Sequence, residues 1–277
     1  MNESRNDRGV EAFWNDLLRT LTSEDYIDLM MSAMCHNDPI YVAYRHYLEE
    51  KFILRKLNID RHDSILDLGC GFGRLTFIFA RLASHVEGVD FSRKYIQIAN
   101  ELKTKHRVSN ATFTCSSALE FSPNPNGYSL IFMGGLLYNI KKDEDIVKLL
   151  TKMKTFMRPN GRFVIREPAL LNNSEIAVTS DDNFRTVDEI AQLFKNVDLH
   201  LERIYEAIPV GPVFYRLAAR LFPRLYNRET VFSENARPIF RLQEYFNWFL
   251  KPIANVKNVL LGHQSLIRHY FHIYAAR

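Results

Sequence analysis

The sequence is poor in cysteine, and the few cysteines lie far apart. Among 277 residues only Cys35, Cys70 and Cys115 are cysteines, and their spacing matches neither a metal-binding motif nor a redox pair. The N-terminal residues are polar and lack the apolar core of a signal peptide. We therefore expect no metal site and no disulfide, in a protein of a reducing compartment, the cytoplasm.

Long apolar runs and a strong excess of one charge are also missing. No run reaches the roughly 18 apolar residues of a membrane span, so we expect no spanning segment. The net charge of +4 is small and scattered, which gives no indication of a nucleic-acid partner. With 47% hydrophobic and 25% charged residues, the composition is that of a globular protein with one large domain or one domain with additions.

The most informative stretch reads ILDLGCGFGRLT, at residues 65–76. Residues 64–68 have the length and apolarity of a buried strand. Gly69, Gly71 and Gly73 follow where the backbone must turn sharply and let a ligand come close. Apolar residues then recur at helical spacing. This pattern predicts the first βα unit of an open α/β sheet, and ligands bind at the carboxyl ends of such strands.

Two acids narrow the choice of ligand. Asp67 stands just before the first glycine, where it would repel the phosphates of a dinucleotide and would suit a ligand with sulfonium and ammonium groups. Asp90 ends a second predicted strand, residues 85–90, about 20 residues beyond the glycines. An acid at this position accepts hydrogen bonds from ribose hydroxyls.

These residues carry a family resemblance. Asp67-Leu-Gly-Cys-Gly-Phe-Gly73, followed by Val89-Asp90, resembles the first two motifs of class I S-adenosylmethionine-dependent methyltransferases. The GxGxG spacing differs from the GxGxxG of dinucleotide enzymes, and a nicotinamide-type Rossmann unit is the alternative interpretation. The resemblance covers residues 65–208. It implies S-adenosylmethionine as cofactor, S-adenosylhomocysteine as product, and a Rossmann-like, seven-stranded, mostly parallel sheet whose last strand is antiparallel.

The remaining patterns predict how the chain is divided. We expect an N-terminal helical lid at residues 1–60, the cofactor-binding core at 61–208, a helical insertion at 209–264 and the final strand at 265–277. The insertion is rich in aromatic residues, which suit a substrate wall, an oligomer face or contact with a membrane surface. Within the core, we expect a helix from Asp143 that ends at Pro159-Asn160-Gly161, followed by a strand over residues 162–166.

The resemblance implies which residues hold the cofactor. Besides the glycine turn and the two acids, these come from the lid and from the ends of the second, third and fourth strands. The cofactor-binding candidates are Tyr44, Arg45, Asp67, Gly69, Cys70, Gly71, Arg74, Asp90, Phe91, Ser117, Ala118, Gly134 and Leu136. Tyr41 is a further lid candidate. The alternative for the lid residues is that the tyrosines belong to the core and Arg45 to the surface. Ser117 stands where the family often has an acid.

Three residues are catalytic candidates: Glu167, Tyr138 and His46. Glu167 follows the fifth predicted strand, where a carboxylate can act as a general base or position an ammonium substrate. Its alternative is a structural salt bridge with a nearby arginine. Tyr138, together with Asn139, can orient a polar nucleophile, or it forms an apolar lid. His46 is a candidate base from the lid, although a lone histidine is more often structural.

Three functions are compatible with these patterns. The first is methyl transfer to an O or N atom of a small molecule, such as a secondary metabolite or a modified sugar or lipid precursor. The second is protein or peptide N-methyltransfer, because the motif order is similar to that of protein α-N-terminal methyltransferases. The third is a non-catalytic binding module that keeps the fold. We expect a small-molecule partner and leave a homodimer and peripheral membrane contact open.

Overall fold

The computed structural model describes residues 18, 21–34, 38–123, 127–170, 183–206, 220–221, 223–224, 228–233, 236–245 and 267–276. Two expectations lie partly or largely outside these ranges: the beginning of the helical lid at residues 1–60 and most of the insertion at 209–264. Among the helices of the described ranges, none combines the length and the apolar character needed to cross a bilayer.

The described residues form alternating strands and helices. The strands are β1 (Ser64–Leu68), β2 (His85–Asp90), β3 (Ala111–Cys115), β4 (Tyr128–Gly134), β5 (Met157–Leu170), β6 (Arg185–Thr186), β7 (Leu199–Glu206) and β8 (Ile267–Ala276). The helices are α2 (Tyr26–Ala33), α3 (Pro39–Lys56), α4 (Thr76–Ala80), α5 (Arg93–Lys105), the 3-10 helix η1 (Leu137–Asn139), α6 (Asp143–Lys154), α7 (Val187–Lys195) and α9 (Arg228–Val231).

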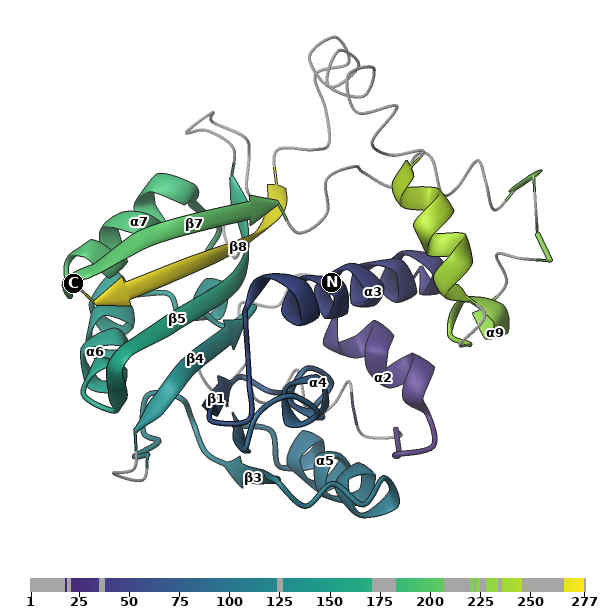
Figure 1. Ribbon diagram of the computed structural model, residues 1–277, viewed down its shortest axis with the longest axis horizontal. Helices are drawn as coiled ribbons and strands as arrows, with labels where there is room; N and C mark the ends of the chain where they lie inside the picture. Colours follow the sequence, from purple (N-terminus) through teal and green to yellow (C-terminus); the bar gives the residue numbers. More distant parts are fainter. Residues whose placement is uncertain are drawn as a thin grey trace, which may run out of the picture.

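Within these ranges, seven strands form one sheet in the order β3-β2-β1-β4-β5-β8-β7, and the two-residue β6 pairs with β5 (Figure 1). The strands from β3 to β5 are parallel neighbours, whereas β8 is antiparallel to both β5 and β7. The expected fold class is therefore confirmed, including the antiparallel last strand. The carboxyl ends of β2, β1, β4 and β5 meet at one edge, where the site lies.

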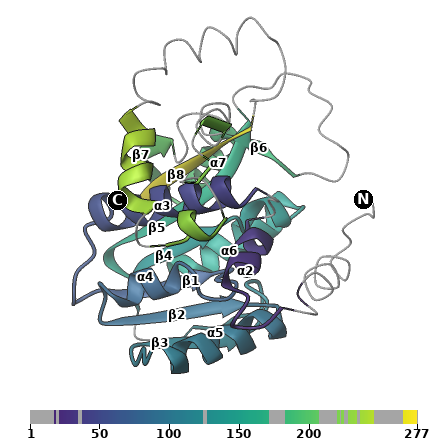
Figure 2. The ribbon, with the colours of Figure 1, turned by 90° about the vertical axis from the view of Figure 1, so that its right-hand side faces the viewer.

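Helices cover both faces of the sheet (Figure 2). One apolar cluster packs α6 and α7 against side chains such as Ile165 of β5. The opposite cluster packs α4 and the C-terminal part of α3 against side chains such as Val164. Because successive side chains of a strand point to opposite faces, Arg166 lies on the α3 face and Glu167 on the α6 face. This alternation decides which of the two charges reaches the site.

The N-terminal helices begin where the sequence caps them. The Asp38 carboxylate accepts hydrogen bonds from the backbone N–H groups of Ile40 and Tyr41, and Pro39 takes the first helical position of α3. The predicted capping box of α7 is confirmed, with Thr186 and Glu189 bonded to each other's backbone N–H. Local capping signals thus fix the start of both helices.

The boundary between α6 and β5 differs from the expectation. We expected the helix to continue to Pro159-Asn160-Gly161, but α6 ends at Lys154 and β5 already begins at Met157. The backbone N–H of Tyr128 donates to Phe156 O at 2.7 Å, and Met157 pairs with Tyr128. Pairing with β4 therefore takes these residues into the sheet. Glu167 likewise lies inside β5, not after it, because β8 extends the pairing as far as Leu170.

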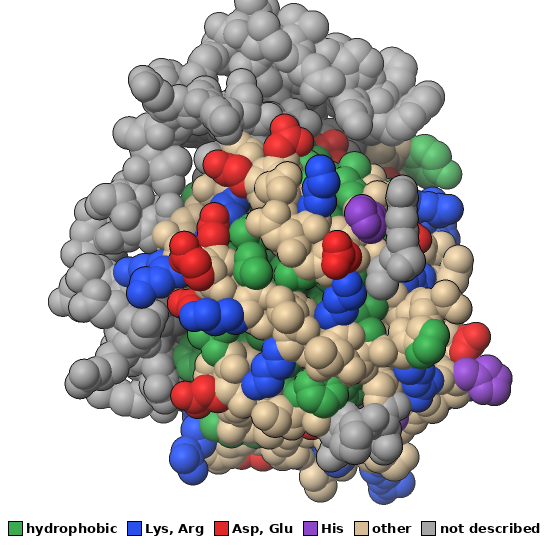
Figure 3. All heavy atoms as spheres, turned by 90° about the vertical axis from the view of Figure 1, so that its left-hand side faces the viewer, with side chains coloured by type: hydrophobic (Ala, Val, Ile, Leu, Met, Phe, Trp, Pro, Cys, Tyr) green, Lys and Arg blue, Asp and Glu red, His purple; other side chains and the backbone are tan. Residues whose placement is uncertain are grey.

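Figure 3 shows the charged side chains on one face of the molecule. Acidic and basic side chains are interspersed there, and the described residues form no continuous region of one sign. The notable grouping of charges in this molecule is internal, at the sheet edge.

Candidate functional site

The turn between β1 and α4 is built by glycine. Gly69, Gly71 and Gly73 have φ angles of 75°, 55° and 85°, a region that L side chains rarely adopt. A Cβ on Gly73 would lie 2.8 Å from the Phe113 ring, whereas one on Gly71 would meet only the Tyr95 ring at 4.0 Å. Gly71 lines the cavity described below, so a side chain there would occupy space that a ligand needs.

Asp90 ties this turn to the end of β2. Its Oδ2 accepts a hydrogen bond from Gly71 N at 2.9 Å, and its Oδ1 accepts one from Ser92 N at 2.8 Å. Each carboxylate oxygen keeps a further lone pair for a ligand hydroxyl. Burial raises the pKa of Asp90 to about 6, although both backbone hydrogen bonds oppose this shift.

Asp67 lies beside it at the end of β1. Its side chain is buried, and its Oδ2 accepts a hydrogen bond from Thr76 Oγ1 at 2.6 Å. Burial raises the pKa of Asp67 to about 7, and the hydrogen bond from Thr76 partly offsets the shift. Bringing a cationic group to these two carboxyls would favour their ionised forms.

A cavity of about 380 Å³ opens at this sheet edge, a volume typical of small-ligand sites. It is lined by the glycine turn, the ends of β2, β4 and β5, and residues of α3 and the end of α2. Its described lining is Ala33, Met34, Tyr41, Arg45, Asp67, Gly69, Cys70, Gly71, Phe72, Arg74, Leu75, Asp90, Phe91, Tyr95, Phe132, Gly134, Gly135, Leu136, Tyr138, Asn139, Arg166, Pro168 and Phe184.

Three arginines of this lining converge on one buried carboxylate. Glu49 of α3 is fully buried. It accepts hydrogen bonds from Arg45 Nε at 3.0 Å and from Arg74 Nη2 at 2.5 Å. It also forms an ion pair with Arg166, Nε to Oε1, at 3.1 Å. The surrounding guanidinium groups hold the pKa of Glu49 well below its usual value against the effect of burial.

Glu167 has a different environment from the one we expected. Its carboxylate is 1% exposed and accepts hydrogen bonds from the backbone N–H groups of Leu136 (2.8 Å), Leu137 (3.0 Å) and Tyr138 (3.4 Å). Burial raises its pKa to about 7, and the bond from Leu137 N is the largest opposing effect. Glu167 does not belong to the described cavity lining, so it holds the loop after β4 in place from behind.

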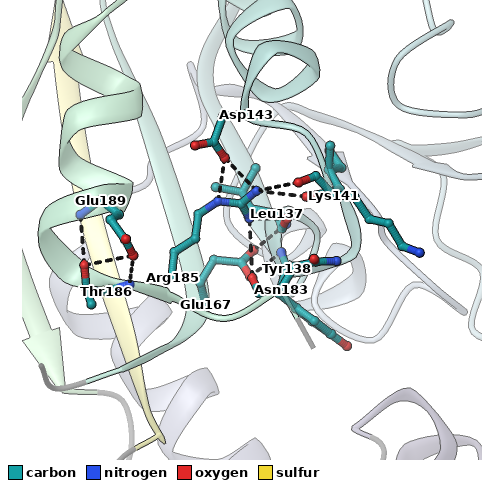
Figure 4. A network of polar contacts seen from close by, with 10 residues as sticks. Leu137, Tyr138, Lys141, Asp143, Glu167, Asn183, Arg185, Thr186 and Glu189 are labelled. Carbon is teal, nitrogen blue, oxygen red and sulfur yellow. Dashed lines mark hydrogen bonds and ion pairs between the residues drawn. The ribbon is translucent and has the colours of Figure 1, made fainter. Parts of the chain in front are cut away.

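A second side chain holds the same loop (Figure 4). Arg185 donates to the backbone oxygens of Leu137 at 3.1 Å and Ile140 at 3.0 Å, and it pairs with Asp143 at 2.8 Å. Together with Glu167 it fixes the segment that carries Tyr138 and Asn139 into the cavity. The two charged residues therefore position the loop without reaching the ligand space.

Most of the predicted site residues meet at this cavity, and a few do not. Its described lining contains ten of the thirteen cofactor candidates, all except Tyr44, Ser117 and Ala118. Of the catalytic candidates it contains Tyr138 but neither His46 nor Glu167. Tyr44 packs against Phe240, with ring centroids 5.5 Å apart. Ser117 accepts a weak hydrogen bond from Leu119 N in the loop after β3.

His46 lies behind Arg74. The Arg74 Nη1 group lies 2.9 Å from His46 Nδ1, and because arginine can only donate, this ring nitrogen accepts. Burial, together with the charge of Arg74, lowers the pKa of His46 to about 3. The His46 imidazole is neutral, and its Nδ1 lone pair already accepts a hydrogen bond from Arg74. His46 therefore supports Arg74 and does not act as a base.

The structure also identifies site residues that we did not single out. Arg166 and Glu49 are the most important, and Phe132, Gly135 and Phe184 complete the wall. The sequence held one signal for Arg166, because a charge inside an apolar strand just before the ligand edge is unusual. It also held one for Glu49, which stands four residues after Arg45 on the same helix face.

The fold and the site together define a class of protein. A glycine turn after β1, an acid at the end of β2 and a seven-stranded sheet with an antiparallel β8 are the features of class I S-adenosylmethionine-dependent methyltransferases. The family described as a methyltransferase domain matches residues 59–210, more than half of the chain, and the chain belongs to this family. The resemblance seen in the sequence is thereby confirmed.

Individual relatives differ in what they act on. N-terminal Xaa-Pro-Lys N-methyltransferase 1-A of Xenopus laevis is 27% identical over 137 residues, 49% of this chain and 61% of the relative. Phosphoethanolamine N-methyltransferase 1 of Triticum aestivum is 32% identical over 106 residues, 38% of this chain and 21% of the relative. The chain thus spans about three fifths of the first relative and about one fifth of the second.

Some solved structures resemble the chain over its whole length. Geranyl diphosphate C-methyltransferase from Streptomyces coelicolor covers 100% of both chains with a TM-score of 0.61 and 13% identity. At this identity the likeness concerns the fold alone. The substrate of the present protein has to be argued from its own residues.

Proposed function

We propose that this protein is an S-adenosylmethionine-dependent methyltransferase that methylates an O or N atom of a small molecule. The observation that carries the proposal is the cavity at the sheet edge. Its lining combines the glycine turn and two acids with three arginines and several aromatic side chains. A secondary metabolite or a modified sugar or lipid precursor is the class of acceptor that we expect.

The residues at the acidic end fit the cofactor. Asp90 retains lone pairs for ribose hydroxyls, and Gly71 leaves open the space beside the turn. Asp67 offers a carboxylate to cationic groups, and Arg74 offers a guanidinium to the methionine carboxylate. Phe91, Gly134 and Leu136 supply the walls. When bound, S-adenosylmethionine supplies an activated methyl group on a sulfonium centre.

The protein's own task is mainly alignment. Direct displacement requires the acceptor atom, the methyl group and sulfur to lie in line, and few dedicated catalytic residues are needed. Tyr138 and Asn139 line the cavity and can orient a polar acceptor through a hydroxyl and an amide. The helices α2 and α3 contribute the side that excludes water. An amine acceptor presented in its neutral form needs no base.

The second candidate is methylation of a protein N-terminus. It is favoured by the similarity to the N-terminal Xaa-Pro-Lys N-methyltransferase of Xenopus laevis. A free N-terminus is cationic, however, and Arg45 and Arg166 line the cavity in addition to Arg74, which we assign to the cofactor. Like charges disfavour such a substrate, which supports the small molecule. The third candidate, a binding module that keeps the fold but has lost its affinity for the cofactor, predicts neither cofactor binding nor methyl transfer.

Two measurements test the proposal. Calorimetry with S-adenosylhomocysteine should show one binding site per chain, and Asp90→Asn should lower the affinity of that site. Incubation with S-adenosylmethionine labelled in its methyl group should then label a component of a small-molecule extract and leave basic peptides unlabelled. Absence of S-adenosylhomocysteine binding by folded protein would refute the assignment and favour the binding module. Binding without any labelled product would count against a small-molecule acceptor.

A further inference from the structure

The charge along the cavity changes sign from one end to the other. Asp90 and Asp67 lie at the ends of β2 and β1. Arg74, Arg45 and Arg166 lie around Glu49, on the side that α3 covers. A ligand that fills the cavity therefore meets both carboxylates and guanidinium groups.

The strand order places Arg166 on the β5 side of the cavity. Arg74 directly follows the glycine turn of β1, whereas Arg166 lies on β5, and β4 runs between the two strands. Both guanidinium groups contact Glu49, so they lie close together although they come from different parts of the sheet edge. With the ribose at Asp90 and the methionine carboxylate at Arg74, Arg166 is on the strand of the cavity that lies farthest from Asp90.

Within the arginine cluster, positive charges outnumber negative ones. Three guanidinium groups contact the single carboxylate of Glu49, and all four side chains are less than 10% exposed. The two further carboxyls of the lining, Asp67 and Asp90, lie at the glycine turn, where burial raises their pKa values to about 7 and about 6. An oxyanion beside the arginines would offset part of the excess.

The neighbouring Glu167 does not supply that anion. It lies on the opposite face of β5, and its oxygens accept backbone hydrogen bonds from the loop after β4. Among the charged neighbours of Arg166, it has the weakest effect on the arginine's pKa. Burial is the largest cause that lowers the pKa of Arg166 to about 10, and repulsion by Arg45 adds to this effect.

We propose that the methyl acceptor is an anionic small molecule whose carboxylate or phosphate group binds to Arg166, with Arg45 contributing from α3. This inference rests on the proposed function and adds the substrate class to it. The acceptor atom then lies between this oxyanion and the cofactor, beside Tyr138 and Asn139. Guanidinium groups bind such oxyanions through paired, charge-assisted hydrogen bonds.

The test uses the full chain saturated with S-adenosylhomocysteine, so that the cofactor carboxylate already occupies its own site. Calorimetric titration with inorganic phosphate and, separately, with acetate should show saturable binding of at least one, and the comparison tells which oxyanion is preferred. Arg166→Gln should weaken this binding at least tenfold while the affinity for S-adenosylhomocysteine changes less than threefold. Arg162→Gln, on the same strand but outside the described cavity lining, should change neither.

The inference would be overturned, with the proposed function intact, if the wild type bound S-adenosylhomocysteine but neither oxyanion. It would also be overturned if Arg166→Gln bound the oxyanion as tightly as the wild type does. Loss of S-adenosylhomocysteine binding by the wild type would instead refute the proposed function. Arg166→Lys keeps the charge and should retain part of the oxyanion affinity if Arg166→Gln does not fold. Independently of any variant, the labelled product should be retained by an anion exchanger at pH 8, and a product that passes through contradicts the inference.

Discussion

The Arg166 guanidinium of β5 lies 3.1 Å from the Glu49 carboxylate of α3, and both side chains are buried. This contact joins the N-terminal helix to the sheet at the edge where the cavity opens. Arg45 and Arg74 share the same carboxylate. Glu49 is therefore the residue that keeps three buried cations together in the absence of a ligand.

Glu49→Gln should destabilise the protein strongly. Removing one partner of a buried ion pair typically costs about 3–5 kcal/mol, because the remaining charges stay buried without compensation. The free energy of unfolding from urea titration measures this effect. Glu244→Gln is the matched control, since Glu244 pairs with Lys51 of the same helix α3 at a partly exposed position, where about 1 kcal/mol or less is expected. Equal effects of the two changes would contradict the central role of Glu49.

Cofactor affinity should rise with pH between about 6 and 8. In the free protein, burial raises the pKa of Asp67 to about 7 and that of Asp90 to about 6. A bound cation favours the ionised carboxylates, so binding must release protons where these groups are still partly protonated. Calorimetry of S-adenosylmethionine binding at pH 6.5, in buffers of different ionisation enthalpy, measures the release. Asp67→Asn should reduce it, and release that is unchanged in this variant would exclude Asp67 as its source.

Glu167→Gln distinguishes a positioning residue from a base. An amide can accept with only one oxygen, so the loop of Leu136 and Leu137 should loosen and stability should fall by about 1–3 kcal/mol. Turnover should decrease, but the pH profile of kcat should keep its shape, because Glu167 does not belong to the described cavity lining. Loss of a limb near pH 7 in the variant would instead restore Glu167 to the role of general base.

His272 of β8 should contribute to acid sensitivity. Its side chain is buried, its Nδ1 lies 3.1 Å from the Tyr274 hydroxyl, and burial lowers its pKa to about 4. The unfolded chain binds a proton near pH 6.5 and the folded chain does not, so stability falls as pH drops from about 6.5 to 4. This group alone accounts for roughly 3 kcal/mol of that loss. His272→Phe should flatten the curve of unfolding free energy against pH in this window, and a curve parallel to that of the wild type would be the contrary result.

The sequence by itself determined the sheet, the cofactor end of the site and most helix starts. The glycine turn, Asp67 and Asp90 are recognisable because each belongs to a strand end, and the ends of parallel strands meet at one edge whatever the rest of the chain does. Ser92 and Thr186 cap their helices through contacts within three residues, which the sequence also displays.

Only the tertiary structure decided the roles of the charged residues beyond the cofactor. Glu49, Arg74 and Arg166 come from segments far apart in the chain, and their meeting depends on how α3 lies across the sheet edge. Whether Glu167 or Arg166 reaches the cavity depends on the register of β5, since neighbouring side chains of a strand point to opposite faces. Burial, which sets the pKa values of these groups, is likewise a property of the packed molecule.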